Sequence, residues 1–256
     1  MTAIKTFSHK YSRWFLPVSL LLGLALWQAI IWLSGLPVFY LPSPFQVFQR
    51  FIAELADGVL LYHTAYTLLE VILGLLLGSS LATATGYAIA KSHLLERLLS
   101  PYLVASQAIP VVAIAPLLVI WFGPGLFSKV LICALIVFFP VLVNTVVGLR
   151  AVPQNLRDLM HGMRSSPFQT LRYLELPAAL PVLLGGLRVG ATLSVIGGVV
   201  GEFVGSDRGL GFLVNVARGQ YDTTLVFVAV ITLIALALAL YGAVVLVERR
   251  MLKWNQ

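Results

Sequence analysis

Six apolar stretches limit the folds that are open to this 256-residue chain. Each is close to the ~20 residues that a helix needs to cross a bilayer. Because lipid offers no hydrogen bonds to the backbone, a single apolar stretch can span it only as a helix or as part of a closed barrel. We therefore predict an all-α, polytopic membrane bundle with about six transmembrane helices, forming one domain over residues 1–256. The expected spans are residues 14–36, 66–90, 102–122, 130–149, 183–204 and 225–247.

The charged residues are few, and their placement predicts a topology. Charged residues make up 11% of the chain, against roughly 25% in soluble domains, and the formal net charge is +7. If both termini are cytoplasmic, only Arg50, Lys129, Arg208 and Arg218 fall in outer loops, and the other basic residues lie inside. This bias follows the positive-inside rule. We expect a multi-pass membrane protein with both termini cytoplasmic, in contact with lipid and not with nucleic acid.

Residues 153–181 form a polar, basic island between the fourth and fifth expected spans. Apolar side chains recur there at i, i+3, i+4 and i+7, which places them on one face of a short helix: Leu156, Leu159, Met160 and Met163. A loop between spans offers little to cover such a face, so we expect another protein to bind it. Arg157, Arg164 and Arg172 would border this contact and orient it.

A second short helix is predicted to follow the first. Ser166 can cap its N-terminus, Pro167 fits the first helical position, and Gln169 completes a capping box. Pro177 is expected to end this helix.

The island resembles the cytoplasmic loop of the permease subunits of ABC importers. That loop reads Glu-Ala-Ala, three residues, Gly, nine residues, Ile-x-Leu-Pro, and residues 174–177 (Leu-Glu-Leu-Pro) match its end. Asp158, Leu159 and Met160 then take the Glu-Ala-Ala positions. Arg164 takes the Gly position, so we expect residues 165–167 (Ser-Ser-Pro) to supply the turn instead. The resemblance implies an ATPase-docking loop over residues 153–177, with these contact residues: Leu156, Arg157, Asp158, Leu159, Met160, Met163, Arg164, Ser166, Leu174 and Pro177.

Further runs resemble the importer branch that serves taurine, alkanesulfonates, nitrate, thiamine-precursor pyrimidine and riboflavin. They are residues 107–123, 138–145 and 201–211. The resemblance implies a type I importer-like permease fold and a homodimer. It also implies cytoplasmic ABC ATPase subunits that hold the ATP and Mg²⁺, and an extracytoplasmic binding protein that delivers the solute. We expect the polar residues Gln107, Asn144 and Glu202 to line the pathway.

The chain lacks the motifs of an enzyme. It has no Gly-x-x-x-x-Gly-Lys-Ser/Thr phosphate loop, and its single cysteine, Cys133, has no metal-ligand spacing around it. We therefore expect no catalytic residue, no metal site and no cofactor in this chain. A secondary transporter is the alternative, but the hydropathy shows no inverted repeat and the spans hold no relay of charged residues. A membrane enzyme ranks third, because no catalytic constellation is present.

Three features leave alternatives open. Gly186, Gly190, Gly197 and Gly201 have close-packing spacing, which suits either packing within one chain or a dimer interface. Glu70 and Glu202 lie inside expected spans, where they would face a cavity or a partner, or else reach interfacial water.

The third open feature is the cargo. No basic side chain is expected deep in a span, and the polar candidates are amides and carboxylates. This favours a flat heterocycle, riboflavin or a thiamine-precursor pyrimidine, over taurine, alkanesulfonates or nitrate. The alternative is that the binding protein alone decides which solute is carried.

Overall fold

The computed structural model describes residues 3–107 and 110–252, and it gives their side chains except at residues 3–16, 93, 100, 104, 106 and 107. Every regular element in this part is helical, which confirms the predicted all-α class. In chain order, the elements are α1 (Ala3–Ser34), α2 (Pro44–Ala56), α3 (Val59–Lys91), α4 (His93–Gln107), α5 (Val111–Phe122), α6 (Leu126–Arg150), α7 (Gln154–Gly162), α8 (Pro167–Thr170), the π-helical turn η1 (Leu171–Glu175), α9 (Leu176–Gly205), α10 (Leu210–Gly219) and α11 (Thr223–Met251).

Among the described residues, five stretches of helix are long and apolar enough to cross a membrane. They lie in α1, α3, α6, α8 through α9, and α11. The expected third span, residues 102–122, is instead divided between α4 and the 12-residue α5. Proline explains the division, because Pro110 has no N–H to donate and takes an extended backbone at the start of α5.

The helices form two compact units. The smaller unit holds Met1–Leu60 and Leu213–Val230, and the larger holds Leu61–Phe212 and Ile231–Gln256. In the smaller unit α2 begins with the capping box of Ser43 and Gln46. Arg50 in α2 pairs with Asp222 at 3.2 Å.

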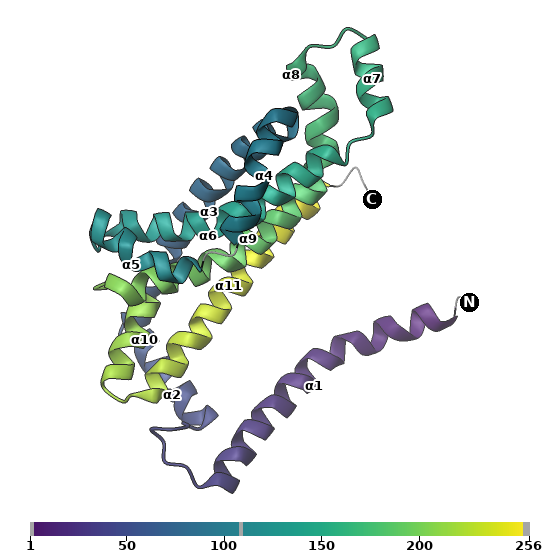
Figure 1. Cartoon of the computed structure of the whole chain (residues 1–256). Helices are drawn as coiled ribbons and strands as arrows, with labels where there is room; N and C mark the ends of the chain where they lie inside the picture. Colours follow the sequence, from purple (N-terminus) through teal and green to yellow (C-terminus); the bar gives the residue numbers. More distant parts are fainter. Residues whose placement is uncertain (1–2, 108–109, 253–256) are drawn as a thin grey trace. The chain divides into compact units, whose positions relative to one another are not determined.

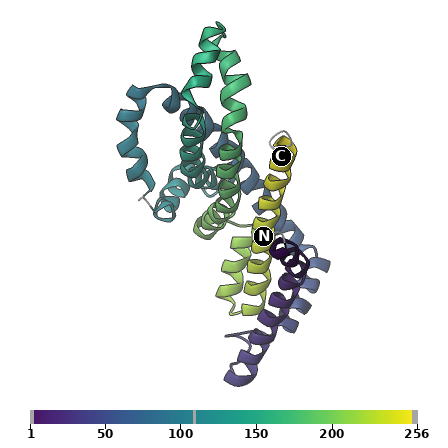
Figure 2. The same ribbon diagram turned by 90° about the vertical axis from the view of Figure 1, so that its right-hand side faces the viewer.

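Helices α6 and α9 form the centre of the larger unit and lie side by side along most of their length (Figures 1 and 2). They are joined by α3 and α11 around one core. All four helices contribute buried side chains to this core: Leu75, Ala82, Ile89, Val137, Val141, Leu142, Ala191 and Val244.

The glycines of α9 serve packing within the chain. A Cβ at Gly197 would lie 2.8 Å from the Cα of Cys133 in α6, and one at Gly186 would lie 2.6 Å from the Cβ of Asn144. A Cβ at Gly190 or at Gly201 would likewise lie 3.2 or 3.3 Å from a side-chain atom of α6. Small residues at these positions let the two backbones approach closely. Of the two alternatives for this spacing, the structure shows packing within one chain.

This close approach predicts a size limit at Gly197. Gly197→Ala places a methyl group against backbone atoms of α6, which cannot rotate away, so we expect a loss of about 1–3 kcal/mol in the free energy of unfolding. The matched control is Gly242→Ala in α11, where a Cβ meets nothing within 4 Å. Thermal unfolding of the purified chain in detergent checks both. Equal melting temperatures for the two variants would contradict this account of the α6–α9 contact.

Candidate docking site

Helices α7 and α8 form a hairpin that extends beyond the ends of α6 and α9 (Figures 1 and 2). The predicted apolar face of α7 is exposed on it: Leu156 is 39%, Leu159 59% and Met163 70% exposed, and Met160 is half-buried. No other part of the larger unit covers these side chains. The described chain thus leaves this face open, as a protein-binding surface requires. That an ATPase binds it stays a prediction.

The turn between α7 and α8 lies at Arg164. Arg164 has a φ of +52°, in the left-handed region that glycine normally fills after a helix. Its N–H donates to the His161 carbonyl at 2.9 Å, and the N–H of Ser165 donates to the Met160 carbonyl at 3.1 Å. These two bonds form a Schellman motif. The expectation that residues 165–167 supply the turn was therefore wrong, because the chain turns at the position where the resembling motif has glycine.

The left-handed backbone predicts which residues position 164 accepts. Arg164→Gly removes a side chain from a conformation that costs L-residues about 1–2 kcal/mol, so hairpin stability should be kept or rise slightly. Arg164→Val puts a β-branched residue in that conformation, which such residues rarely adopt, and should lower the stability of the hairpin. Limited proteolysis of the α7–α8 hairpin in both variants checks the order. Faster cleavage of the Gly variant than of the Val variant would contradict it.

Helix α8 begins as predicted but does not end as predicted. Ser166 accepts from the N–H of Gln169, and the Gln169 side chain accepts from the N–H of Ser166, which confirms the capping box. Pro177 does not stop the helix, which continues through η1 into α9. In η1 the N–H of Leu176 donates to the carbonyl of Leu171, five residues back. This wider turn accommodates the proline, which has no N–H of its own.

A buried carboxylate, Glu175, stands at the base of the hairpin and pairs with two basic side chains that are partly exposed. Glu175 is 1% exposed, and its Oε1 lies 2.7 Å from the Lys91 Nζ at the end of α3 and 3.8 Å from the Arg157 Nε in α7. Arg157 also donates from Nη2 to the Leu149 carbonyl of α6 at 2.6 Å. Glu175 therefore connects α3, α7 and the start of α9. Its Oε2 makes no hydrogen bond within the described residues, and it lines a pocket of about 480 Å³ under the hairpin.

The remaining docking candidates divide between two sides of the hairpin. Arg157 points inward, so it does not border the exposed face as predicted. Arg164 and Arg172 are exposed, and so is Asp158, which accepts from Gln154 Nε2 at 3.0 Å. Leu174 and Pro177 are half-buried where η1 joins α9.

Two of the three pathway candidates lie inside the chain's own packing. Asn144 donates from Nδ2 to the Pro140 carbonyl at 2.8 Å and packs against Gly186. Glu202 is 1% exposed. Gln107 ends α4, and its side chain lies outside the described residues. A pathway role for these residues stays a prediction.

Glu202 anchors the start of α10. It accepts from Thr67 Oγ1 at 2.7 Å and from the backbone N–H of Gly211. The N–H of Leu210 in turn donates to Thr67 Oγ1 at 2.8 Å. A carboxylate at a helix N-terminus satisfies free N–H groups and is favoured by the helix dipole. Burial shows that the alternative of contact with interfacial water was wrong for Glu202.

Lys129 has a role that its place in the sequence did not predict. It was placed in an outer loop, but it lies in the first turn of α6, 2% exposed, with its Nζ 3.0 Å from Glu70 Oε1. The placement of Lys129 in an outer loop was therefore wrong, while the premise that no basic side chain lies deep in a span still holds for the described residues, because Lys129 lies at the end of its helix. Glu70 is also buried, at 1% exposed, and of its alternatives the structure shows that it faces a cavity and a partner. A carboxylate within a span needs a partner. Lys129 is the only basic residue in the sequence of α6 near that end, so the pairing of Glu70 with Lys129 could have been proposed from the sequence.

Comparison with known proteins decides the family. Residues 71–253 match the family described as binding-protein-dependent transport system inner membrane component. The chain belongs to this family of ABC importer permeases. It is therefore a multi-pass protein of the inner membrane. In such transporters the ATPase activity lies in a separate subunit, and the family implies ATPase and binding-protein partners.

Relatives of this permease serve several solutes. It is 50% identical to the riboflavin transport system permease protein of Chloroflexus aurantiacus. The alignment covers 94% of this chain and 90% of that relative. It is 34% identical over 92% of its length to the formylaminopyrimidine transport permease of Halalkalibacterium halodurans, with 94% covered. Its identity to the taurine transport permease of Escherichia coli is 31% over 91%, with 86% covered.

A solved structure supports the fold. The inward-facing MetNI methionine ABC transporter matches with a TM-score of 0.66 at 20% identity. The match covers 77% of this permease and 98% of that chain. Importer permeases of this kind thus share the helical arrangement seen here.

Proposed function

We propose that this permease carries a flat heterocyclic solute, riboflavin or a close relative, delivered by an extracytoplasmic binding protein. One observation carries the choice: the 50% identity to a riboflavin permease extends over 94% of the chain. The formylaminopyrimidine relative, another flat heterocycle carrier by name, is 34% identical. The sulfonate and taurine relatives are 33% and 31% identical.

The permease acts as a homodimer in this proposal, and each copy docks one ATPase through the apolar face of α7. Two observations support the docking role. Leu159 and Met163 are among the more exposed large apolar side chains of the hairpin, and an amphipathic helix of this kind fits a groove on a partner. ATP and Mg²⁺ are held by the ATPase, and both termini of the permease lie on the same cytoplasmic side as the hairpin.

Uptake into proteoliposomes tests the proposal. The permease is reconstituted with its ATPase and the binding protein, with ATP inside the vesicles or absent. We expect riboflavin to accumulate only with ATP and to do so unchanged when the proton or sodium gradient is collapsed. Accumulation of taurine and not riboflavin would contradict the cargo. Uptake by the permease alone, driven by an ion gradient, would contradict the importer role itself.

A further inference from the structure

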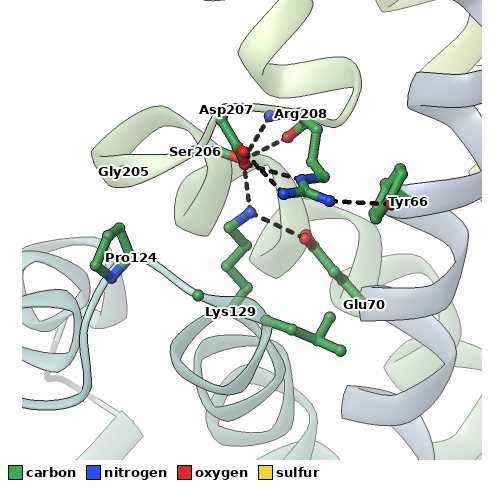
Figure 3. A pocket seen from close by; sticks show the side chains of 10 residues that line it. Tyr66, Glu70, Pro124, Lys129, Gly205, Ser206, Asp207 and Arg208 are labelled. Carbon is green, nitrogen blue, oxygen red and sulfur yellow. Dashed lines mark hydrogen bonds and ion pairs between the residues drawn. The ribbon is translucent and has the colours of Figure 1, made fainter.

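A pocket of about 850 Å³ lies at the end of α9 that is far from the docking hairpin. Helix α9 has 30 residues, which makes it about 45 Å long, longer than the ~30 Å hydrocarbon core of a bilayer. The pocket and the hairpin are thus on opposite sides of the membrane. Its lining comes from α3, from the segment that leads into α6, and from the loop after α9 (Figure 3). A volume of this size suits a small organic ligand.

Two ion pairs make the lining electrically neutral. Lys129 pairs with Glu70, as described above, and Arg208 pairs with Asp207 through Nε and Nη2 at 2.9 and 2.8 Å. The hydrogen bonds from Arg208 hold the pKa of Asp207 at about 2, so this carboxylate stays charged and balances the guanidinium. A pocket whose charges cancel gives no advantage to a strong anion such as a sulfonate. Its ligand should be uncharged.

Hydrogen-bonding capacity remains at the floor of the pocket. Glu70 is buried, and its Oε2 makes no hydrogen bond within the described residues, so it can accept one. Lys129 Nζ donates to Glu70 Oε1 and, at 2.5 Å, to Ser206 Oγ (Figure 3), which leaves one of its three N–H groups. An acceptor beside a donor complements a ligand that presents an N–H beside a C=O.

The walls of the pocket suit a flat ring. The Arg208 guanidinium lies over the Tyr66 ring, 4.7 Å from its centre, and also donates to the Tyr66 hydroxyl at 3.0 Å. Planar guanidinium and phenol groups fixed in this way offer stacking surfaces. The facing side holds Pro124, Gly125 and Gly205, whose small size leaves room for a ring to enter.

We propose that this pocket binds a planar, uncharged heterocycle that presents an N–H beside a C=O, with Glu70 Oε2 accepting from the N–H and Lys129 Nζ donating to the C=O. The inference rests on the proposed function and deepens it, because it gives the permease its own recognition site for the solute that the binding protein releases. The isoalloxazine ring of riboflavin, with its imide edge, has this chemistry.

Riboflavin binding to the full-length permease alone, in lipid nanodiscs, tests the site. The probe is the fluorescence of riboflavin, compared with that of riboflavin methylated at the imide nitrogen, which has lost the N–H. We expect saturable binding of riboflavin, weakened about tenfold by methylation and about tenfold by Glu70→Gln, since each removes the same charge-assisted hydrogen bond. The two losses of affinity should not add. Glu70→Gln should bind the methylated ligand as weakly as the wild-type permease does, because the hydrogen bond is already absent.

Two further variants keep the test decisive. Tyr66→Leu leaves the buried carboxylates of Glu70 and Glu202 in place and should weaken riboflavin binding because the stacking surface is lost. This variant still tests the site if Glu70→Gln fails to fold. Glu248→Gln breaks the 3.3 Å pair with Arg188 away from the pocket and should leave binding unchanged. The site is overturned if the wild-type permease does not bind riboflavin, or if taurine displaces riboflavin. It is also overturned if Glu70→Gln, Tyr66→Leu and methylation all leave binding unaltered.

The site and the proposed function fail in different ways. Riboflavin uptake that needs ATP, with no binding to the permease alone, would leave the function standing and overturn the site. Binding that depends on Glu70, without riboflavin uptake by the complete transporter, would support the site and overturn the cargo.

Discussion

Leu159→Asp should abolish assembly of the permease with its ATPase. Leu159 is 59% exposed at the centre of the apolar face of α7, and a charge there would have to be buried in the partner's groove without a counter-ion, which costs several kcal/mol. We expect the amount of ATPase that co-purifies with the permease to fall at least a hundredfold. ATP-driven uptake should be lost with it.

The control for this variant is Asn155→Asp. It adds the same charge to the same helix, but on a residue that lies off the apolar face and already accepts a hydrogen bond from the N–H of Leu156. Assembly should be normal in this variant. If Leu159→Asp keeps its ATPase, the face does not bind it. If Leu159→Asp instead lowers expression of the permease as a whole, the face packs against the chain's own spans.

Glu175→Gln should separate ATP hydrolysis from transport. The buried Glu175 carboxylate joins Lys91 of α3, Arg157 of α7 and the start of α9, so it fixes the hairpin to the helices that span the membrane. Without the charge of Glu175, the hairpin still presents α7 to the ATPase. A movement of the hairpin is then coupled less tightly to α9, because the ion pairs that connect them are weakened. We expect uptake to fall at least tenfold while the bound ATPase and its hydrolysis rate stay near normal.

Glu96→Gln is the matched control for this second prediction. Glu96 pairs with Arg150 in a partly exposed ion pair, which carries little energy because water screens it. Uptake by this variant should be unchanged. A loss of ATPase binding in Glu175→Gln equal to its loss of uptake would show that Glu175 only holds the hairpin folded.

The sequence predicted what depends on local pattern. Apolar length predicted the membrane helices, and the capping residue Ser166 marked a helix start that the structure confirms. The period of the apolar residues predicted the exposed face of α7. In each case neighbouring residues decide the outcome, and the rest of the fold does not override them.

Contacts between distant segments could not be predicted in this way. Lys129 and Glu70 are 59 residues apart, and Glu175 and Lys91 are 84 apart, so no spacing rule joins them. The helix that continues through Pro177 was missed because the π-helical turn before it depends on hydrogen bonds five residues apart. The turn at Arg164 was missed because a non-glycine residue rarely takes that backbone.

Cross-linking from α7 tests the central claim most directly. Cys133, the single native cysteine, is buried, so a cysteine at Met163, which is 70% exposed, or at the half-buried Met160 would be the reactive thiol on the hairpin. In native membranes, a short cross-linker with one thiol-reactive and one photoreactive end should join the Met163→Cys and Met160→Cys permeases to the ATPase subunit in high yield. Cross-links that form only to lipid or to a second permease, with none to the ATPase, would contradict the account.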